Sequence, residues 1–299
     1  MKEHEEGTVV ITGASSGIGR ATALYLADKG FRVFAGVRKP ADAETLRIES
    51  GGRVVPVEID VTDGATISAA EKAVRAAAGE GGLDGLVNNA GIATPAPVEY
   101  MSADVLRRQF EVNVFGQVSV TQAFLPLIRR ARGRIVNVGS VGSHIALPFG
   151  GALCSSKGAF TLLSDALRLE LRPYGVHVCI IEPGAISTPA VDKTLGDVEA
   201  LVHSLPPEGA ARYGAKLREF MRRGHERETK GSRPVVVAEA IHHALTSRRP
   251  RLRYPVGADA RLLVTLPRVL PERALDQVRL RALGMPTDFG CEPATETTT

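Results

Sequence analysis

Short runs rich in β-branched residues alternate with longer helical patterns through the first two-thirds of the chain, and this alternation constrains the fold more than any other feature. Strands that alternate with helices form parallel sheets covered by helices on both faces. The sequence therefore predicts an α/β fold built on one doubly wound parallel sheet. The expected strands are Thr8–Thr12, Arg32–Val37, Arg53–Ile59, Leu83–Asn88, Arg134–Val138 and His177–Glu182. The clearest helices between them are Gly17–Lys29, Thr66–Ala78, Ser102–Leu125 and Ala152–Tyr174.

The regular alternation ends after Pro183, where the chain becomes rich in charge, proline and glycine. The remaining predicted elements are the helices Ala210–Arg223 and Val235–Thr246, the strand Arg251–Val256, and a basic amphipathic helix over Ala258–Leu283, interrupted at Pro267 and Pro271. We expect one domain over residues 1–285, with a C-terminal extension over 258–285. The polar tail over 286–299 is expected to be disordered.

The first expected strand leads directly into the turn Thr12–Gly19, which has the spacing Gly-x-x-x-Gly-x-Gly and is followed by a helix. Glycines permit the tight turn and let the backbone approach a pyrophosphate. The helix N-terminus offers free N–H groups and the positive end of its dipole to phosphates. This strand–turn–helix context indicates a Rossmann-type dinucleotide site. The residues expected to bind the dinucleotide here are Thr12, Gly13, Ser15, Ser16, Gly17, Ile18 and Gly19.

The end of the second strand indicates which dinucleotide is bound. NAD sites usually place an acidic residue at this position to bind the ribose 2′-hydroxyl. Val37 occupies the position and cannot form that bond, whereas Arg38 follows it and can pair with a 2′-phosphate. The sequence therefore favours NADP(H) over NAD(H). The alternative is a surface arginine beside a cofactor site of mixed preference.

Several further motifs follow the glycine turn in a fixed order. They are Asp60-Val61, Asn88-Asn89-Ala90-Gly91, Asn113, Ser140 after the fifth strand, Lys157 on the next helix, and Pro183-Gly184 at the end of the sixth strand. In this order the motifs resemble those of the short-chain dehydrogenase/reductase (SDR) family, strongly from Thr8 to Thr188. The segment from Gly139 to Phe149 and the long C-terminal part are similar to the branch that contains 17β-hydroxysteroid and retinol dehydrogenases. That branch acts on lipophilic alcohols and ketones.

The resemblance implies cofactor contacts beyond the glycine turn and Arg38. They begin at the adenine, continue past the ribose and the central strand, and end along the nicotinamide. In that order the implied positions are Asp60, Val61, Asn89, Ala90, Gly91, Lys157, Pro183, Gly184, Ile186 and Thr188.

The resemblance also implies a reaction centre of three residues. Asn113 is expected to help hold a proton-relay water, Ser140 to hydrogen-bond the substrate oxygen, and Lys157 to bind the nicotinamide ribose. The family forms dimers and tetramers through its two long helices, so we expect a homodimer or a homotetramer.

The acid/base residue of the family is missing from this sequence. The family places a tyrosine four residues before the lysine and thirteen after the serine, and both counts lead to Leu153. Residues four apart share one helix face, so a tyrosine there would lie beside the Lys157 ammonium, which would lower the pKa of the phenol. Leucine can neither donate nor accept a proton, and loss of a general acid typically lowers a rate by about 10²–10⁴.

Four explanations remain open. The protein reduces a carbonyl with a proton from the substrate itself or from a water on Ser140 or Lys157. Alternatively, His144, on the loop after Ser140, replaces the tyrosine. In the third explanation the protein binds cofactor and ligand without redox turnover, as a sensor, scaffold or non-redox catalyst, and in the fourth Leu153 is an engineered substitution. Retention of Ser140, Lys157 and Asn113 favours a working oxidoreductase, with a bulky steroid-, retinoid- or polyketide-like substrate.

The segment 188–233 is expected to cross the strand ends as a lid. Its apolar residues either line a pocket for a lipophilic substrate or pack as ordinary core. They are Leu195, Val198, Leu201, Val202 and Leu205. For the helix Ala258–Leu283, docking on the domain is favoured over a dimer contact or a place on a membrane surface.

Charge and cysteine content limit which other partners are expected. The formal net charge is +4, and the basic residues gather late in the chain, but no nucleic-acid motif accompanies them. We therefore expect a solvated basic face and no nucleic-acid partner. Three irregularly spaced cysteines suggest neither disulfides nor a metal site. With no apolar leader and no run of membrane-spanning length, a cytoplasmic protein is expected.

Overall fold

The computed structural model describes residues 7–189 and 198–288 of the chain. Seven parallel strands form one sheet in the order β3-β2-β1-β4-β5-β6-β7. The strands are β1 (Thr8–Ile11), β2 (Arg32–Val37), β3 (Val54–Glu58), β4 (Gly85–Asn88), β5 (Arg134–Val138), β6 (His177–Pro183) and β7 (Arg253–Val256). The predicted doubly wound parallel sheet is confirmed, with strand ends displaced by no more than about two residues.

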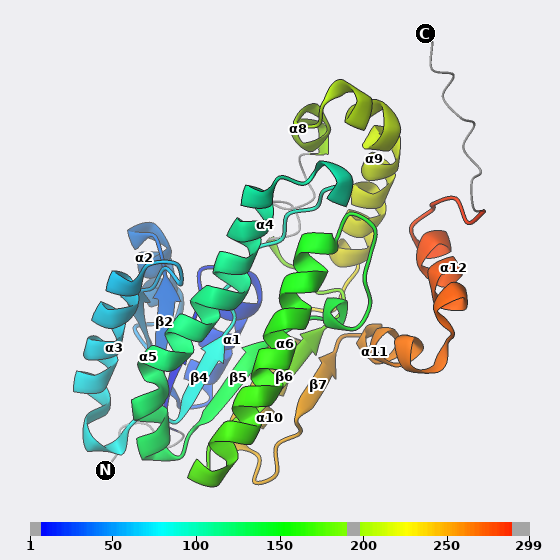
Figure 1. The fold of residues 1–299 in the computed structure, drawn as a ribbon. Coiled ribbons are helices and arrows are strands. Elements are labelled where there is room, and N and C mark those ends of the chain that lie inside the picture. The colour runs from blue at the N-terminus through cyan, green and yellow to red at the C-terminus, as the bar shows by residue number, and fades with distance from the viewer. Residues whose placement is uncertain (1–6, 190–197, 289–299) are drawn as a thin grey trace.

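Helices cover both faces of the sheet (Figure 1). One face carries α1 (Gly17–Asp28) and α10 (Val235–Thr246), and the other carries α3 (Gly64–Ala78), α5 (Gly116–Ala131) and α6 (Gly151–Leu171). The sequence did not indicate α2 (Pro40–Glu49), a short helix of low hydrophobicity that packs beside β2 and β3.

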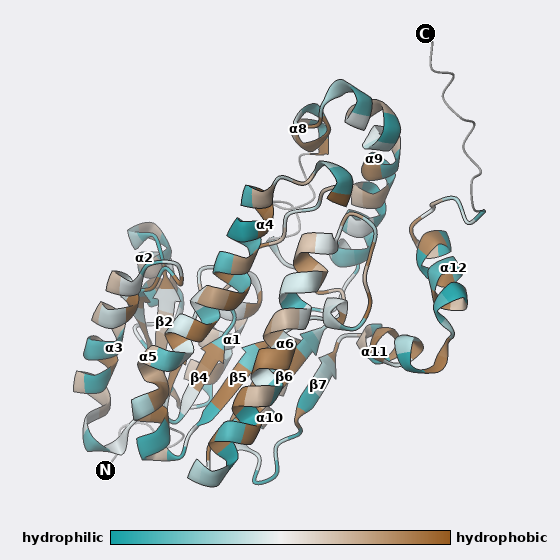
Figure 2. Ribbon diagram, viewed as in Figure 1, coloured by the Kyte–Doolittle hydropathy of each residue, from teal (hydrophilic) through white to brown (hydrophobic). Residues whose placement is uncertain are grey.

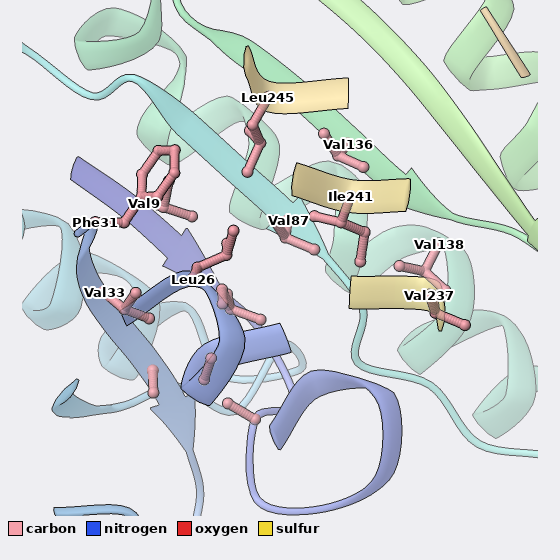
Figure 3. Packing of buried hydrophobic residues seen from close by; sticks show 14 of the residues in the cluster. Val9, Leu26, Phe31, Val33, Val87, Val136, Val138, Val237, Ile241 and Leu245 are labelled. Carbon is pink, nitrogen blue, oxygen red and sulfur yellow. The ribbon is translucent and has the colours of Figure 1, made fainter. Parts of the chain in front are cut away.

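The hydrophobic core has one layer on each side of the sheet. Figure 2 shows that the strands are largely hydrophobic and that the covering helices mix hydrophobic and hydrophilic residues. In the layer under α1 and α10, Leu26 and Ile241 pack against Val9, Val87 and Val136 (Figure 3). All five side chains are fully buried. Burial of such a side chain contributes about 1.5–3 kcal/mol, so these layers fix the helices on the sheet.

Two predictions are wrong, the helix end at Leu125 and the break at Pro267. The helix expected to end at Leu125 continues through Pro126 to Ala131, because Pro126 is exposed while Leu127 and Ile128 behind it are fully buried. Pro267 lies inside α11 (Ala260–Val269), and the helix continues past it for two residues. The predicted break at Pro271 is confirmed, since α12 (Glu272–Ala282) begins directly after it.

The predicted long helix that begins at Ser102 is composite. It starts as α4 (Ala103–Phe110), widens into a π-turn over Glu111–Phe115, and continues as α5. A π-turn inserts an extra residue into a helix and is frequent at functional sites. Here it contains Asn113, one of the expected site residues.

The remaining helices lie beyond one end and one edge of the sheet. The segment expected to form a lid contains α8 (Val198–His203) and α9 (Pro207–Thr229), and α11 and α12 follow β7 (Figure 1). Among the described residues, no helix is both long enough and apolar enough to cross a membrane. The chain order reverses between β1 and β4, and ligands bind such sheets beyond the carboxyl ends of the strands at that point.

Candidate active site

Three glycines shape the turn between β1 and α1. Gly13 and Gly17 have φ angles of +63° and +55°, in the region that favours glycine. A side chain on Gly13 would place its Cβ 2.7 Å from the Ala90 Cα, and one on Gly19 would collide with the Gly13 carbonyl oxygen. The turn therefore lies tightly against the end of β4, and the N-terminus of α1 is free to face a phosphate.

Hydrogen bonds between Thr12 and Asn89 join the ends of β1 and β4. The Thr12 Oγ1 accepts bonds from the backbone N–H groups of Asn89 and Ala90, at 2.9 and 3.0 Å. The Asn89 amide donates to the carbonyl oxygens of Thr12 and Gly13, at 3.0 and 3.1 Å. These bonds therefore fix the glycine turn and the segment after β4 relative to each other.

A cleft of about 400 Å³ opens at this point of the sheet. Its lining includes most residues of the glycine turn, the ends of β2 and β3, and the segment after β4. The expected cofactor residues that line it are Gly13, Ser15, Ser16, Gly17, Ile18, Arg38, Asp60, Val61, Asn89, Ala90, Gly91 and Thr188. Thr12, Gly19, Lys157, Pro183, Gly184 and Ile186 are outside this lining.

The sequence did not mark six further residues as cofactor contacts, although they line the cleft. They are Gly36, Val37, Ile59, Ile92, Ala93 and Val112. Val37, Ile59 and Ile92 directly precede or follow an expected contact, and Gly36 and Ala93 lie two positions from one, so the neighbouring motif was the available signal. Val112 adjoins Asn113 in sequence, but its place in the cleft follows only from the packing of α4 and α5 against Val61.

Charged groups surround the end of the cleft formed by β2 and β3. The Arg38 Nη1 lies 4.0 Å from the Asp60 Oδ2. Burial alone would raise the pKa of Asp60, but two hydrogen bonds from Thr62 and the charges of Arg38 and Arg108 outweigh it and lower that pKa. Asp60 is therefore ionised at neutral pH, beside two arginines.

The opposite end of the cleft reaches a buried lysine. The Lys157 Nζ donates a 2.7 Å hydrogen bond to the Val138 carbonyl, and burial lowers its pKa to about 8. A Cβ on Gly91 would lie 3.8 Å from the Lys157 Nζ and 3.3 Å from the Asn113 Oδ1. The structure thus brings Lys157 and Asn113 together at Gly91, which itself lines the cleft.

Asn113 is held by the segment that follows β4. Its amide donates to the Ile92 carbonyl at 3.0 Å and to the Ser156 Oγ at 3.1 Å, and its Oδ1 accepts from the Ile92 N–H. Ser156, on α6, was not predicted as part of this cluster. Because Asn113 joins α5, α6 and the end of β4, it fixes the backbone around Gly91.

Ser140 lies near the start of the loop between β5 and α6, and Leu153 lies in the first turn of α6 after that loop. The Ser140 Oγ accepts a bond from the Gly142 N–H at 3.0 Å and caps a short 3₁₀ turn over Val141–Ser143. Leu153 is half-buried on α6, one helical turn before Lys157. The side chain beside the lysine on this helix face is therefore apolar.

His144 belongs to a network centred on the fully buried carboxylate of Glu182. Its Nε2 lies 2.6 Å from the Oε1 of Glu182, a residue with no solvent exposure. The same oxygen accepts a 2.7 Å bond from Arg253, which also bonds Asp165 at 2.5 Å. One ring nitrogen of His144 is thus bound to a carboxylate, and the loop after Ser140 is anchored to β6 and β7.

The segment after β6 is held by the C-terminal part of the chain. Asp259 accepts a 3.1 Å bond from the Ala185 N–H, and Glu228 at the end of α9 accepts one of equal length from the Ile186 N–H. Burial raises the pKa of Glu228. Beyond Ile186 the chain approaches the glycine turn, where a Cβ on Gly17 would lie 3.2 Å from the Thr188 Cβ.

The helices of the expected lid pack on the loop between β5 and α6. The apolar residues predicted there join one buried cluster with residues of α9, and Leu195 lies outside the described residues. The cluster contains Phe149, Val202, Leu217, Phe220 and Met221, with Leu147, Val198, Leu201 and Leu205 packed against it. Tyr213 and Arg212 tie α9 to Glu99, through bonds of 2.7 and 2.5 Å.

The parallel sheet, the glycine turn and the cleft at the reversal of strand order define a dinucleotide-binding α/β protein. Residues 7–198 match the model of the short chain dehydrogenase family. The chain belongs to this family, whose members are oxidoreductases that use nicotinamide dinucleotides.

Individual relatives agree with this assignment. The chain is 39% identical over 276 residues to retinol dehydrogenase 5 of Mus musculus, covering 90% of this chain and 86% of the relative. A short-chain dehydrogenase from Streptomyces avermitilis has a similar structure, with a TM-score of 0.70, 30% identity, and coverage of 94% and 96%. Another, from Burkholderia cenocepacia in complex with NADP, has a TM-score of 0.68 and 27% identity, with coverage of 94% and 99%.

Proposed function

We propose that this protein is an NADP(H)-dependent oxidoreductase that interconverts a bulky lipophilic alcohol and its ketone or aldehyde. The observation that carries the proposal is a cleft that is lined by Arg38 and by Gly91, with the buried Lys157 and Asn113 directly behind Gly91. Retinol dehydrogenase 5, a relative of similar length, supports a retinoid-like substrate.

The bound nicotinamide supplies a hydride donor or acceptor, and the protein supplies its position and the proton. The crowded turn at Gly13 and Gly19 admits a pyrophosphate to the N-terminus of α1. In the proposed roles, Lys157 binds the nicotinamide ribose, Ser140 hydrogen-bonds the substrate oxygen, and Asn113 keeps the backbone near Gly91 in place.

The proposed proton route is atypical, because Leu153 offers no proton beside Lys157. Two residues are proposed as the donor. The Lys157 ammonium, with a pKa of about 8, carries a transferable proton at neutral pH. His144 is the alternative, although its Nε2 already contacts Glu182.

The test compares the native protein with Leu153→Tyr, and with Leu153→Phe as a control that adds the ring without the hydroxyl. NADPH oxidation is followed with retinaldehyde and with a panel of steroid and polyketide ketones. We expect measurable turnover in the native protein and an increase of about 10²-fold or more in Leu153→Tyr alone. Turnover only in Leu153→Tyr would contradict the proposal.

That last outcome would support a second candidate, a cofactor-binding protein without redox turnover. The apolar side chain of Leu153 next to Lys157 is the observation that favours it. In that case the native protein would bind NADPH, with a heat signal in calorimetry, while producing no product with any carbonyl compound.

We further propose a homodimer or homotetramer formed through α5 and α6. Phe115, the last residue of the π-turn before α5, and Leu162 and Leu169 on α6 are large apolar residues that are 56%, 72% and 59% exposed. Apolar patches of this kind mark protein–protein contacts. Light scattering of the native protein and of Leu162→Glu would test this, and a monomeric native protein would contradict it.

A further inference from the structure

Side-chain hydrogen bonds fix how the rod formed by α4 and α5 is rotated about its axis. Gln109 donates to the Ile92 carbonyl at 2.5 Å, Asn113 donates to the same oxygen at 3.0 Å, and Gln117 donates to the Ala90 carbonyl. These residues are spaced by four and form one row along the rod. The row therefore faces the segment after β4, on one side of the cleft.

The adjacent row of the rod faces the segment after β3, on the other side. A Cβ on Gly116 would lie 2.6 Å from the Val61 carbonyl oxygen, so the rod touches this segment directly. Val112 packs in one cluster with Val61 and lines the cleft. Arg108 comes one turn before Val112 on the same helix face, near Asp60 at the rim.

Arg108 is exposed and has no carboxylate within ion-pairing distance among residues 7–189 and 198–288. Its charge nevertheless helps to lower the pKa of Asp60, as does that of Arg38. Arg38 itself approaches a carboxylate only at 4.0 Å, and 63% of its side chain is exposed. Arg38 thus borders the end of the cleft, Arg108 lies close enough to act on the same carboxylate, and Asp60 is the one acidic group between the two arginines.

From this arrangement we propose that Arg108 and Arg38 together form a two-armed site for the 2′-phosphate of NADP(H). The proposal rests on the cofactor preference proposed above, and it adds a residue from α4 to the one at the end of β2. A phosphate monoester carries close to two negative charges, and each guanidinium can donate two parallel hydrogen bonds to its oxygens.

The next residue along α4 provides a matched control. Arg107 is also exposed, but it forms a 2.9 Å bond with Asp104 on its own helix. It does not belong to the row that contains Val112. Arg107→Ala therefore removes the same charge from the same helix without altering the proposed site.

The experiment is calorimetric titration of NADPH and NADH into the native protein, Arg108→Ala, Arg38→Ala and Arg107→Ala. We expect the Kd for NADPH to rise about tenfold in Arg108→Ala, as for loss of one exposed charge-assisted contact, with less than a twofold change for NADH. Arg107→Ala should match the native protein. Arg108→Lys, which retains the charge but not the fork, should recover part of the affinity.

Two results would overturn the role of Arg108 while leaving the proposed function intact. One is an unchanged Kd for NADPH in Arg108→Ala, and the other is an equal loss for NADPH and NADH. If the native protein binds NADH as tightly as NADPH, the cofactor proposal itself is wrong. The thermal unfolding of each variant, measured alongside, shows that affinity rather than folding has changed.

Discussion

Lys157 is a buried cation. The charge on its side chain lowers the stability of the fold, although its proposed role in the site requires the lysine. Its side chain is 9% exposed, and burial lowers its pKa from 10.5 to about 8. That fall corresponds to about 3 kcal/mol by which the folded state disfavours the ammonium at neutral pH. Methionine has a similar length and carries no charge, so Lys157→Met removes this unfavourable free energy.

A smaller loss opposes the gain. The substitution deletes the 2.7 Å hydrogen bond from the Lys157 Nζ and leaves the Val138 carbonyl unpaired, at a cost of about 1–2 kcal/mol. We therefore expect the free energy of unfolding of Lys157→Met to exceed that of the native protein by about 1–2 kcal/mol at pH 7. Because Lys157 is also a proposed site residue, turnover and cofactor affinity should fall.

The sign of the pH dependence follows from the direction of the pKa change. The unfolded state binds more protons than the folded state between about pH 8 and 10.5, so native stability rises across this window relative to the variant. The advantage of Lys157→Met should thus shrink by about 2 kcal/mol between pH 7 and pH 9.5. Urea unfolding of both proteins at the two pH values measures the difference, in which all other titrating groups cancel.

Two results would refute the reasoning. A variant less stable than the native protein at pH 7 would mean that the hydrogen bond to Val138 outweighs the burial of charge. An advantage that stays constant between pH 7 and pH 9.5 would mean that Lys157 titrates at its ordinary pKa in the folded protein.

Two further substitutions test the clamps around the cleft. Asn89→Ala removes both bonds to the glycine turn, so we expect the Kd for NADPH in calorimetry to rise about tenfold; an unchanged Kd would show that the turn is rigid without Asn89. Glu182→Gln leaves Arg253 without its fully buried carboxylate and should lower the free energy of urea unfolding by about 3 kcal/mol. Asp165→Asn, at a site 29% exposed, serves as its control and should have a smaller effect; equal losses would contradict the importance of burial.

Much of the cleft could be predicted because its determinants are local in sequence. The Gly13 turn follows its strand directly, and Asp60 and Asn89 each follow a strand whose end must lie at the same edge of a parallel sheet. The network around Glu182 could not be predicted in this way. Arg253 comes 71 positions after Glu182 in the sequence. No local pattern shows that Arg253 bonds the same Glu182 oxygen as His144 does.

The sequence by itself determined the parallel α/β sheet, the dinucleotide turn and the apolar residue at position 153, since each is written in neighbouring residues or in their spacing. Only the tertiary structure decided that Lys157 is buried enough for its pKa to fall, and that the α4–α5 rod turns Arg108 toward Asp60. The physical reason is that burial and helix rotation are set by packing between distant segments. Local propensity does not encode either of them.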